Sequence, residues 1–396
     1  MKNQLSFLAF AVALVSVLLL EGCSVAPPIR IAPDQPAIAV PAEPALQPVL
    51  KPADWTALAG WADDDIQPAW EAFLRSCAVL KNQPLWQETC IEGDAMGPQN
   101  AVMLRQFIES RFTPHQVLNP DGSGDGLITG YYEPLLKGSR TQSRRYRYPI
   151  YTTPDELLVV DLGEIYPELK NMRLRGRLQG RKVVPYYSRS EIESNPAPLK
   201  GRELLWVDDE VELFFLQIQG SGRVQLENGG IVRVGYSDQN GYPYKSIGRL
   251  LVERGELPLE KASMQGIKAW GQRNPHKLGE LLQQNASFVF FRELPGDLPG
   301  PLGALGVPLT AGRSLAIDPR AVPQGAPVFL ATTWPNTDKR LHRLMVAQDT
   351  GGAIKGNVRA DFFWGFGPEA ADQAGKMKQM GKMWVLMPSR GFVPQR

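Results

Sequence analysis

The last third of the sequence repeats one pattern three times: Ser314-Leu315-Ala316-Ile317-Asp318-Pro319, then Met345-Val346-Ala347-Gln348-Asp349-Thr350-Gly351-Gly352, and then Arg359-Ala360-Asp361-Phe362-Phe363-Trp364-Gly365. Each segment has a short apolar run, an aspartate and a turn, which is typical of buried strands and their ends. Further apolar runs at 328–330 and 383–386 complete a set of short strands. Together they predict a mainly β fold with peripheral helices, built around a compact barrel.

The three aspartates are the first candidates for chemistry. An aspartate at a strand end commonly accepts hydrogen bonds from turn amides, which is a purely structural role. The strand ends of a small barrel converge on one mouth, however, so Asp318, Asp349 and Asp361 are expected to lie together there. Burial beside aromatic rings raises the pKa of a carboxyl group, and Phe362, Phe363 and Trp364 follow Asp361. We therefore predict Asp361 as a general acid, with Asp349 ionised and orienting its neighbours and Asp318 also supporting.

The composition excludes several other classes of protein. The 396 residues are enough for two domains, and 43 Lys+Arg against 41 Asp+Glu give a formal charge of only +2, which argues against nucleic-acid binding. The three histidines, His115, His276 and His342, lie far apart, and no HExxH, CxxC or GxSxG motif occurs. The sequence therefore predicts no metal site and no cofactor, and it leaves carboxylates to carry the chemistry.

The N-terminus indicates export from the cytoplasm. An apolar run at 5–20 is too short for a comfortable bilayer span and leads to Leu20-Glu21-Gly22-Cys23, which resembles a bacterial lipobox. We predict a lipoprotein signal peptide over 1–22 and lipidation of Cys23; the alternative is an ordinary cleaved signal with an incidental cysteine. Ser24 favours the outer membrane. The Pro/Ala-rich residues 23–54 are expected to be an extended tether that holds a folded domain on the periplasmic face of the outer membrane of a Gram-negative bacterium.

The first half of the folded part combines helices with a strand. Apolar spacings of three and four predict helices within 55–111, including one over 101–112, and a turn at 119–126 leads to a strand at 127–132. Cys77 and Cys90 lie in the helical part. Outside the cytoplasm they can form a disulfide, but two buried free thiols fit the sequence nearly as well.

A meander of strands and short helices is expected next. The apolar run 213–219 predicts a strand interrupted by Gly220-Ser221-Gly222, and 223–226 and 231–234 predict a hairpin around Asn228-Gly229. Helices are predicted at 264–270 and 277–284. One more helix is predicted to begin at Pro368 and to end just before Gly381.

Several motifs now identify a family. The three aspartates, with Gly351-Gly352-Ala353-Ile354-Lys355-Gly356 and Gly365-Phe366-Gly367-Pro368-Glu369-Ala370, closely resemble the "3D" domain of the MltA-type membrane-bound lytic murein transglycosylases. The resemblance extends to Gly130-Tyr131-Tyr132-Glu133-Pro134, Gln217-Ile218-Gln219-Gly220-Ser221-Gly222 and 242–248. It implies a double-psi β-barrel domain (55–135 and 287–396, with the 3D motif at about 305–390) interrupted by a second β-rich domain (136–286), and a glycan strand bound between them.

The resemblance also implies an activity. Such an enzyme is a lytic exotransglycosylase that cleaves the β-1,4 bond between MurNAc and GlcNAc in peptidoglycan without water and leaves 1,6-anhydro-MurNAc ends. Its one catalytic aspartate maps onto Asp361, although the family usually has His-Phe where this chain has Arg359-Ala360. The sequence by itself distinguishes neither exo from endo action nor whether stem peptides are required. We expect a monomer, with cell-wall synthesis or degradation complexes as further partners.

Six residues are candidates for binding the glycan strand: Tyr131, Tyr132, Glu133, Gln217, Gln219 and Ser221. Amide and hydroxyl groups suit acetamido groups of the sugar, and a tyrosine ring can stack on a sugar, although a strand tyrosine is equally often a core residue. Glu133 is an alternative second acid, but a glutamate before proline more often faces solvent. Two other functions stay open: a non-catalytic peptidoglycan-binding module, and a hydrolytic muramidase that uses Asp361 with a second carboxylate.

Overall fold

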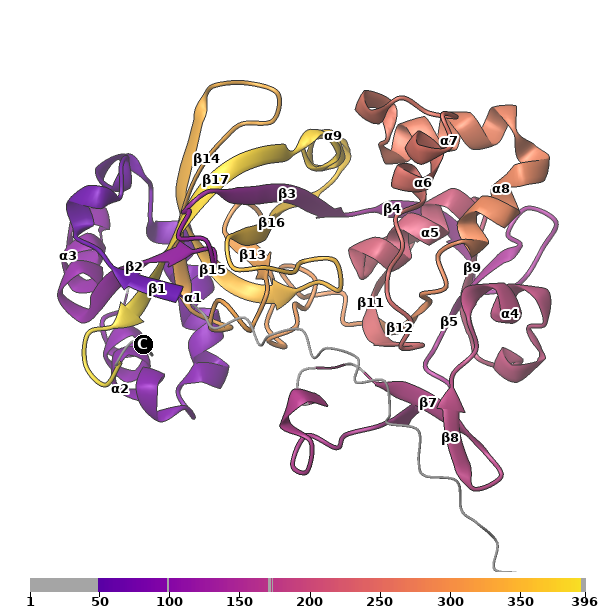
Figure 1. Cartoon of the computed structure of the whole chain (residues 1–396), viewed down its shortest axis with the longest axis horizontal. Coiled ribbons are helices and arrows are strands. Elements are labelled where there is room, and N and C mark those ends of the chain that lie inside the picture. Colours follow the sequence, from indigo (N-terminus) through magenta and orange to yellow (C-terminus); the bar gives the residue numbers. More distant parts are fainter. Residues whose placement is uncertain (1–48, 98–99, 170–171, 173, 393–396) are drawn as a thin grey trace, which may run out of the picture. The chain divides into compact units, whose positions relative to one another are not determined.

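A closed barrel of six strands organises much of the described chain. The structure is a computed structural model that describes residues 49–97, 100–169, 172 and 174–392 (Figure 1). The barrel strands are β3 (Gly126–Glu133), β13 (Ser314–Ile317), β14 (Pro327–Thr333), β15 (Arg340–Thr350), β16 (Arg359–Phe366) and β17 (Lys378–Pro388). They are hydrogen-bonded in the order β17-β14-β15-β13-β16-β3, and pairing of β17 with β3 closes the ring. The predicted β-rich fold with a barrel is confirmed, while the double-psi pattern of connections stays a prediction.

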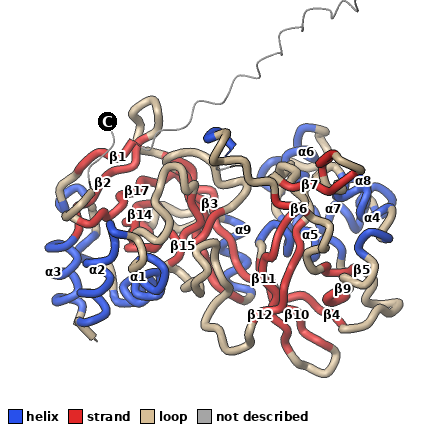
Figure 2. Tube along the Cα trace, turned by 90° about the horizontal axis from the view of Figure 1, so that it is seen from below, coloured by secondary structure: helices blue, strands red, loops and turns tan. Residues whose placement is uncertain are grey.

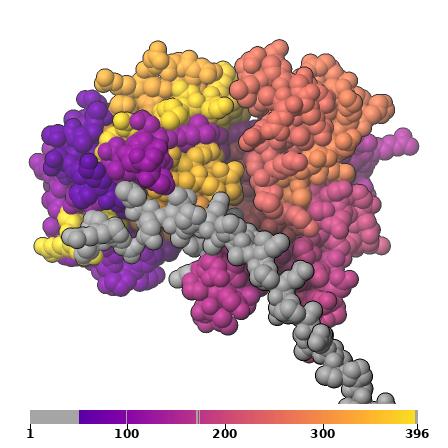
Figure 3. Space-filling model, in the orientation of Figure 1, coloured from indigo at the N-terminus to yellow at the C-terminus, as the bar shows by residue number. Residues whose placement is uncertain are grey.

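Segments from both ends of the described chain build this domain. Strand β1 (Val49–Pro52) pairs with β2 (Phe112–Leu118), and β2 pairs with β17. Figure 3 accordingly shows early residues in indigo beside late residues in yellow. The apolar runs fill the interior, where Phe329, Met345 and Phe362 are fully buried. Residues 49–52, predicted as part of the tether, are therefore strand β1, because their backbone pairs with 115–118.

Three helices cover one side of the barrel (Figure 2). They are α1 (Gln67–Leu80), α2 (Pro84–Ala95) and α3 (Ala101–Arg111), as the apolar spacing predicts. Trp70, Phe73 and Leu80 of α1 are buried in the same hydrophobic cluster as the barrel strands. The helices therefore share their core with the barrel.

A disulfide joins two of these helices. Cys77 of α1 and Cys90 of α2 are bonded, with their Cα atoms 5.3 Å apart and a sequence separation of 13. The sequence left a disulfide and two free thiols open, and the structure shows the disulfide. Closing a loop of this length restricts the unfolded chain and stabilises the fold by about 3 kcal/mol.

A second sheet follows directly from the barrel. Its strands are β4 (Leu135–Ser139), β5 (Tyr148–Tyr151), β9 (Glu203–Val207), β10 (Ser221–Leu226), β11 (Ile231–Gln239) and β12 (Val289–Leu294), in the order β12-β11-β10-β4-β9-β5. Only Pro134 separates β3 from β4, and the chain returns to the barrel after β12. A small sheet of β6 (Leu158–Val159), β7 (Arg175–Gln179) and β8 (Lys182–Pro185) lies within this insertion.

Helices and short turns complete the described chain. The α-helices are α4 (Arg189–Ser194), α5 (Glu210–Gln219), α6 (Ile247–Glu253), α7 (Met264–Arg273), α8 (Pro275–Gln283) and α9 (Pro368–Lys376). Short 3-10 helices are η1 (Trp55–Ala57), η2 (Trp61–Asp63), η3 (Pro167–Leu169), η4 (Ala197–Leu199) and η5 (Leu259–Lys261). In the part of the chain that the structure describes, no helix combines the length and the apolar character needed to cross a membrane.

The predicted strand at 213–219 is wrong, because these residues belong to helix α5. The Asp209 side chain accepts hydrogen bonds from the backbone N–H groups of Val211 and Glu212 and so begins the helix. Gly220, with φ of +77°, ends it in the left-handed conformation. A short apolar run that is buried on most sides has no periodicity that separates helix from strand.

The predicted end of the last helix is also wrong. Helix α9 begins at Pro368 as expected but ends at Lys376, and Gly381 lies inside strand β17 opposite Gly126. A Cβ at residue 381 would lie 2.7 Å from the Ile128 side chain and 3.0 Å from the Ala331 carbonyl oxygen. The glycine therefore serves close strand packing. The predicted signal peptide, Cys23 and most of the tether lie outside the described residues.

Candidate active site

Four neighbouring strands place two of the aspartates in one row. Ala316 on β13 is paired with Asp361 on β16 at one side and with Asp349 on β15 at the other. Thr129 on β3 is paired with Asp361 from the far side of β16. Residues directly opposite one another across a sheet project from the same face. Asp349 and Asp361 therefore lie on either side of Ala316, on the same face of the sheet.

Asp361 has the electrostatic environment of an acid that titrates near neutral pH. Its side chain is partly exposed, and one carboxylate oxygen accepts a hydrogen bond of 2.7 Å from the Thr129 hydroxyl. Burial raises the pKa of Asp361 from 3.8 to about 6; the Thr129 hydrogen bond and the charge of Arg359 oppose this rise, and the charge of Asp349 adds to it. The direction agrees with the sequence prediction.

Arg359 and Thr129 form a short chain of contacts to this carboxylate. The Arg359 guanidinium donates to the Thr129 hydroxyl oxygen at 2.9 Å, and the same hydroxyl donates to Asp361. Arg359 also donates to the Leu127 carbonyl at 3.2 Å. This arrangement holds the donor hydrogen of Thr129 toward the acid, and it places a positive charge where the negative form of Asp361 appears.

Asp349 is fixed by several donors. One carboxylate oxygen accepts from the Tyr131 hydroxyl at 3.0 Å, and the other accepts from the backbone N–H groups of Ala304 and Thr350, both at 2.9 Å. The Tyr131 ring packs against Phe363, with ring centres 5.1 Å apart. Burial, together with the nearby carboxylates, raises the pKa of Tyr131, so the phenol keeps its proton. The arrangement suits an orienting role for Asp349.

Asp318 is bound by partners of its own, separate from those of Asp349 and Asp361, and the convergence of all three aspartates stays a prediction. Its buried carboxylate is held by the Arg320 guanidinium at 2.7 Å and by the Gly356 backbone N–H at 3.0 Å. Burial alone would raise the pKa of Asp318, but these hydrogen bonds outweigh it and lower the pKa. Strand β13 ends at Ile317, so Asp318 caps the following turn and stabilises it.

A cavity of about 490 Å³ opens beside Asp349. From the barrel domain and the connection before it, the cavity is lined by Leu302–Ala304, Gly306, Leu309 and Asp349–Ala353; from the second domain, by Gln217–Ser221, Tyr236, Ser237 and Arg292 among others. Asp361 itself does not line this cavity and lies two strands away from Asp349 in the sheet. In the described part of the chain, no three His, Cys, Asp or Glu side chains gather as a metal site requires.

Sequence comparisons identify the family of this site. The chain matches the family model described as the MltA specific insert domain over residues 127–292 and the model of the 3D domain over 313–387. It is 33% identical over 283 residues to membrane-bound lytic murein transglycosylase A of Escherichia coli (strain K12), covering 70% of this chain and 69% of that protein. The chain belongs to the MltA family of lytic transglycosylases.

Solved structures agree with this assignment to the MltA family. The crystal structure of MltA from Neisseria gonorrhoeae is 41% identical and superposes with a TM-score of 0.75, covering 87% of this chain and 94% of that one. The crystal structure of Escherichia coli MltA with bound chitohexaose is 28% identical, with a TM-score of 0.60 and coverage of 86% and 91%. The fold assignment therefore rests on nearly the whole described chain.

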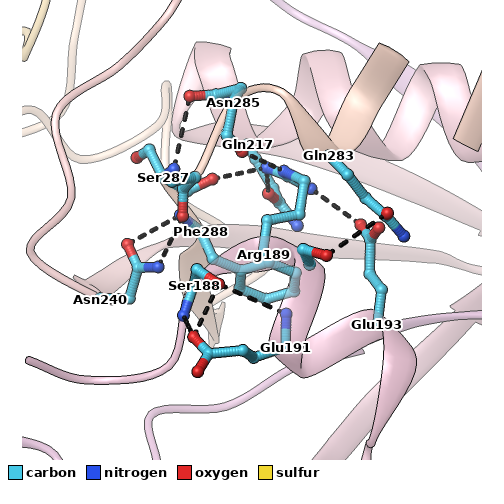
Figure 4. A network of polar contacts seen from close by, with 12 residues as sticks. Ser188, Arg189, Glu191, Glu193, Gln217, Asn240, Gln283, Asn285, Ser287 and Phe288 are labelled. Atoms are coloured by element: carbon cyan, nitrogen blue, oxygen red, sulfur yellow. Dashed lines mark hydrogen bonds and ion pairs between the residues drawn. The ribbon is translucent and has the colours of Figure 1, made fainter. Parts of the chain in front are cut away.

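The predicted glutamine and serine contacts gather at the cavity of this MltA-family chain. Gln217, Gln219 and Ser221 all line it, although the two glutamines come from helix α5 and not from a strand. The Arg189 guanidinium donates to the Gln217 side-chain oxygen (Figure 4), which fixes the orientation of that amide. The Gln219 side-chain oxygen accepts from the Tyr132 backbone N–H at 3.0 Å and so ties α5 to β3.

Tyr132 and Glu133 lie away from the large cavity. The Tyr132 side chain is buried and lines two smaller cavities, of about 160 and 360 Å³. Glu133 is only 1% exposed and forms ion pairs with Arg223 at 2.8 Å and Arg233 at 3.5 Å. The alternative that Glu133 faces solvent is therefore wrong, and its carboxylate is engaged by two arginines.

The sequence does not indicate a role for Thr129 beyond membership of a strand, because its position beside Asp361 depends on the parallel register of β3 and β16. It marks Arg359 only as a departure from the family pattern. Side chains alternate along a strand, so the side chain of Arg359 lies on the same face as that of Asp361. The two-residue spacing was therefore enough to predict that Arg359 lies near Asp361.

Proposed function

We propose that this protein is a peptidoglycan lytic transglycosylase that cleaves the β-1,4 bond between MurNAc and GlcNAc, with Asp361 as its catalytic residue. The observation that carries the proposal is the pKa of Asp361, which burial raises to about 6 in a partly exposed carboxyl group. Such a group is protonated in a useful fraction of molecules near neutral pH. Membership of the MltA family and the chitohexaose complex of the Escherichia coli relative also support it.

The proposed reaction uses the same carboxyl group twice. Protonated Asp361 first donates its proton to the glycosidic oxygen while the bond from that oxygen to C1 of MurNAc breaks, through an oxocarbenium-like transition state. The Asp361 carboxylate then accepts the proton of the C6 hydroxyl of the same MurNAc ring, as that oxygen attacks C1. The product is a 1,6-anhydro-MurNAc end, and no water is consumed. Because the nucleophile is already part of the reacting ring, little entropy is lost in bringing it to C1.

The surroundings of Asp361 suit both halves of this cycle. Burial favours the neutral acid that the first step needs, whereas the Thr129 hydroxyl and the Arg359 charge favour the carboxylate that the second step needs. A muramidase would need a second carboxylate to activate water or attack C1. Asp349 already accepts hydrogen bonds from Tyr131, Ala304 and Thr350, so it fits orientation better than proton transfer. This favours transglycosylation over hydrolysis.

Analysis of the reaction products tests the proposal. Purified peptidoglycan is digested with the protein, and the soluble fragments are weighed by mass spectrometry. Fragments lighter than hydrolytic products by one water support transglycosylation. New reducing ends would indicate a muramidase, and an absence of fragments would favour a binding module.

Changing Arg359 to Gln is expected to alter the pH dependence of activity. Since the acid must be protonated, kcat/KM should be high below about pH 6 and fall as the pH rises through the pKa of Asp361. The positive charge of Arg359 lowers that pKa, so Arg359→Gln should move the fall to higher pH, and Arg359→Lys should move it less. The measurement is kcat/KM across a pH series. Arg340→Gln, at an exposed position, is the control, and a fall that stays in place or moves to lower pH would contradict the expectation.

We also propose that a lipid on Cys23 anchors the enzyme to the periplasmic face of the outer membrane. The lipobox-like sequence at 20–23 supports this, and the Escherichia coli relative is named as membrane-bound. Replacing Cys23 with Ala should move the protein from the membrane fraction to the soluble fraction of lysed cells, whereas Ser24→Ala should leave it in the membrane fraction. A Cys23→Ala protein that has lost residues 1–22 and still sediments with membranes would rule out this anchor.

A further inference from the structure

The charged residues that line the cavity of about 490 Å³ differ in whether they have partners within the protein. Arg175, Arg189, Arg292 and Asp349 are the charged members of its described lining. Arg175 forms an ion pair of 2.8 Å with Asp238. Arg189 is almost fully buried, is paired with Glu193 at 3.2 Å, and donates to the Ser287 carbonyl and to Gln217 (Figure 4). Arg175, Arg189 and Asp349 therefore already have hydrogen-bond or ion-pair partners within the protein.

Arg292 differs from these residues. It lies on β12 opposite Gly235 of β11, its side chain is exposed, and among the described residues it has no ion-pair or hydrogen-bond partner. Gly235 has no side chain that could pair with it. The next residue, Glu293, is held by the Arg140 guanidinium through two hydrogen bonds of 2.8 and 2.9 Å. In the described part of the chain, Arg292 is therefore the one guanidinium of the cavity whose N–H donors have no partner within the protein.

We propose that Arg292 binds a carboxylate of the muramyl residue and so selects muramyl glycan over neutral glycan. The proposal rests on the function proposed above and deepens it. A guanidinium is planar and carries five N–H donors, a geometry that matches a carboxylate through two parallel hydrogen bonds. An uncharged chito-oligosaccharide offers only hydroxyl and acetamido groups, which bind a guanidinium more weakly.

The substrate supplies such a carboxylate in either of two places. MurNAc differs from GlcNAc by a lactyl ether on O3, which ends in a free carboxylate in strands without peptides. In strands with stem peptides the lactyl group is an amide, but the peptide brings carboxylates of its own. Both sources offer the same chemistry to Arg292. Arg292 of the second domain lines the same cavity as Gly351–Ala353 of the barrel, so a glycan strand bound in that cavity would bring its charged groups near the guanidinium.

Binding measurements without turnover test the assignment. The full-length Asp361→Asn protein, with and without Arg292→Met or Arg292→Lys, is titrated with ligands of equal chain length by calorimetry. The ligands are chitohexaose, a peptide-free hexasaccharide of alternating GlcNAc and MurNAc, the same hexasaccharide with its lactyl groups converted to methylamides, and a hexasaccharide with stem peptides. Arg292→Met should raise the Kd for a carboxylate-bearing ligand about tenfold, as expected for the loss of a charged hydrogen bond. It should leave the Kd for chitohexaose and for the methylamide unchanged, and Arg292→Lys should cause a smaller loss.

The pattern across ligands identifies the carboxylate. A loss confined to the peptide-free strand assigns the lactyl carboxylate, and a loss confined to the peptide-bearing strand assigns the stem peptide. Added salt should weaken the preference of the Arg292 protein for carboxylate-bearing ligands and have less effect on the Arg292→Met protein. An equal loss for all four ligands, or no loss for any, would overturn the assignment.

Two controls separate this result from other failures. Arg249→Met removes an arginine that is exposed on α6 and outside the cavity, and it should change no Kd. Thermal denaturation of each variant checks that it is folded. Because the titrations involve no turnover, a wrong assignment of the catalytic acid would appear in the product analysis and not in these binding data.

Discussion

Replacement of Asp361 by Asn is expected to reduce the release of soluble peptidoglycan fragments by about a thousandfold or more, because general acid catalysis typically contributes factors of that order. An amide cannot donate the proton to the glycosidic oxygen and cannot accept the proton of the C6 hydroxyl, so both proposed steps fail. The amide oxygen can still accept the hydrogen bond from Thr129, so the local structure should be kept. Initial rates of fragment release, measured by chromatography and mass spectrometry, give the ratio of activities.

The control for this variant is Asp338→Asn, which changes an exposed carboxylate in the turn between β14 and β15 and should keep full activity. Activity of the Asp361→Asn protein within a few-fold of the unchanged enzyme would move the catalytic acid elsewhere, with Asp349 as the next residue to test.

The same substitution should make the fold more stable at pH 8. The pKa of Asp361 is about 6 in the folded protein against 3.8 ordinarily, so its ionisation destabilises the fold progressively from about pH 4 to pH 6 and fully above pH 6; below about pH 4 the group is protonated in both states and the effect vanishes. The gain for Asn should be about 2 kcal/mol, since each pKa unit corresponds to about 1.4 kcal/mol and partial exposure reduces the full amount. Denaturant unfolding at pH 8 and pH 4 distinguishes this from an effect independent of pH. Such a gain in stability on removal of a catalytic group is the usual trade-off between the stability and the activity of an enzyme.

Replacement of Glu133 by Ala is expected to destabilise the fold by about 4 kcal/mol, the usual cost of removing one partner of a buried ion pair. Glu133 is 1% exposed, and its loss leaves the nearly buried Arg233 without its carboxylate. The effect should be a lower midpoint in denaturant unfolding, and substrate affinity should fall only as far as the folded fraction falls.

An exposed pair of the same kind provides the control. Glu293 binds Arg140 through two hydrogen bonds, but both side chains are nearly half exposed, so Glu293→Ala should cost at most about 1 kcal/mol. If both variants lost the same free energy of unfolding, the burial of Glu133 would not contribute to the stability of the fold. A stable Glu133→Ala protein that has lost glycan affinity would instead restore the sequence prediction that Glu133 binds substrate.

The barrel strands could be predicted because each combines a short apolar run with turn residues at its end. Helix α5 could not, since an apolar run such as Leu213-Phe214-Phe215-Leu216 is buried in either conformation and only its cap, Asp209, distinguishes helix from strand. The helical spacing around Cys77 was clear, but its bond to Cys90 depends on how α1 and α2 pack, which periodicity does not specify.

The residue types of the candidate site could be predicted from the sequence, but the contacts between those residues could not. The apolar neighbours of Asp361 correctly indicated a raised pKa. The register between strands decides which aspartates meet: Ala316 brings Asp349 and Asp361 to its two sides, whereas Asp318 lies beyond the end of β13. That register depends on long-range pairing, so the contact of Thr129 with Asp361 could not be predicted from the local sequence.

Strand β3 links chemistry to domain architecture in a way that constrains change in this enzyme. Thr129 donates to Asp361, Tyr131 donates to Asp349, and Glu133 binds the arginines of the second sheet, so alternate residues of one strand serve three different tasks. All three project from one face and span roughly 13 Å of rigid backbone, with Pro134 leading at once into β4. A shift of the second domain that pulled on β3 would therefore alter the support of both aspartates together. Insertions or deletions between 129 and 134 should consequently be tolerated far less than those in any surface loop, because no single contact on this strand can be adjusted alone.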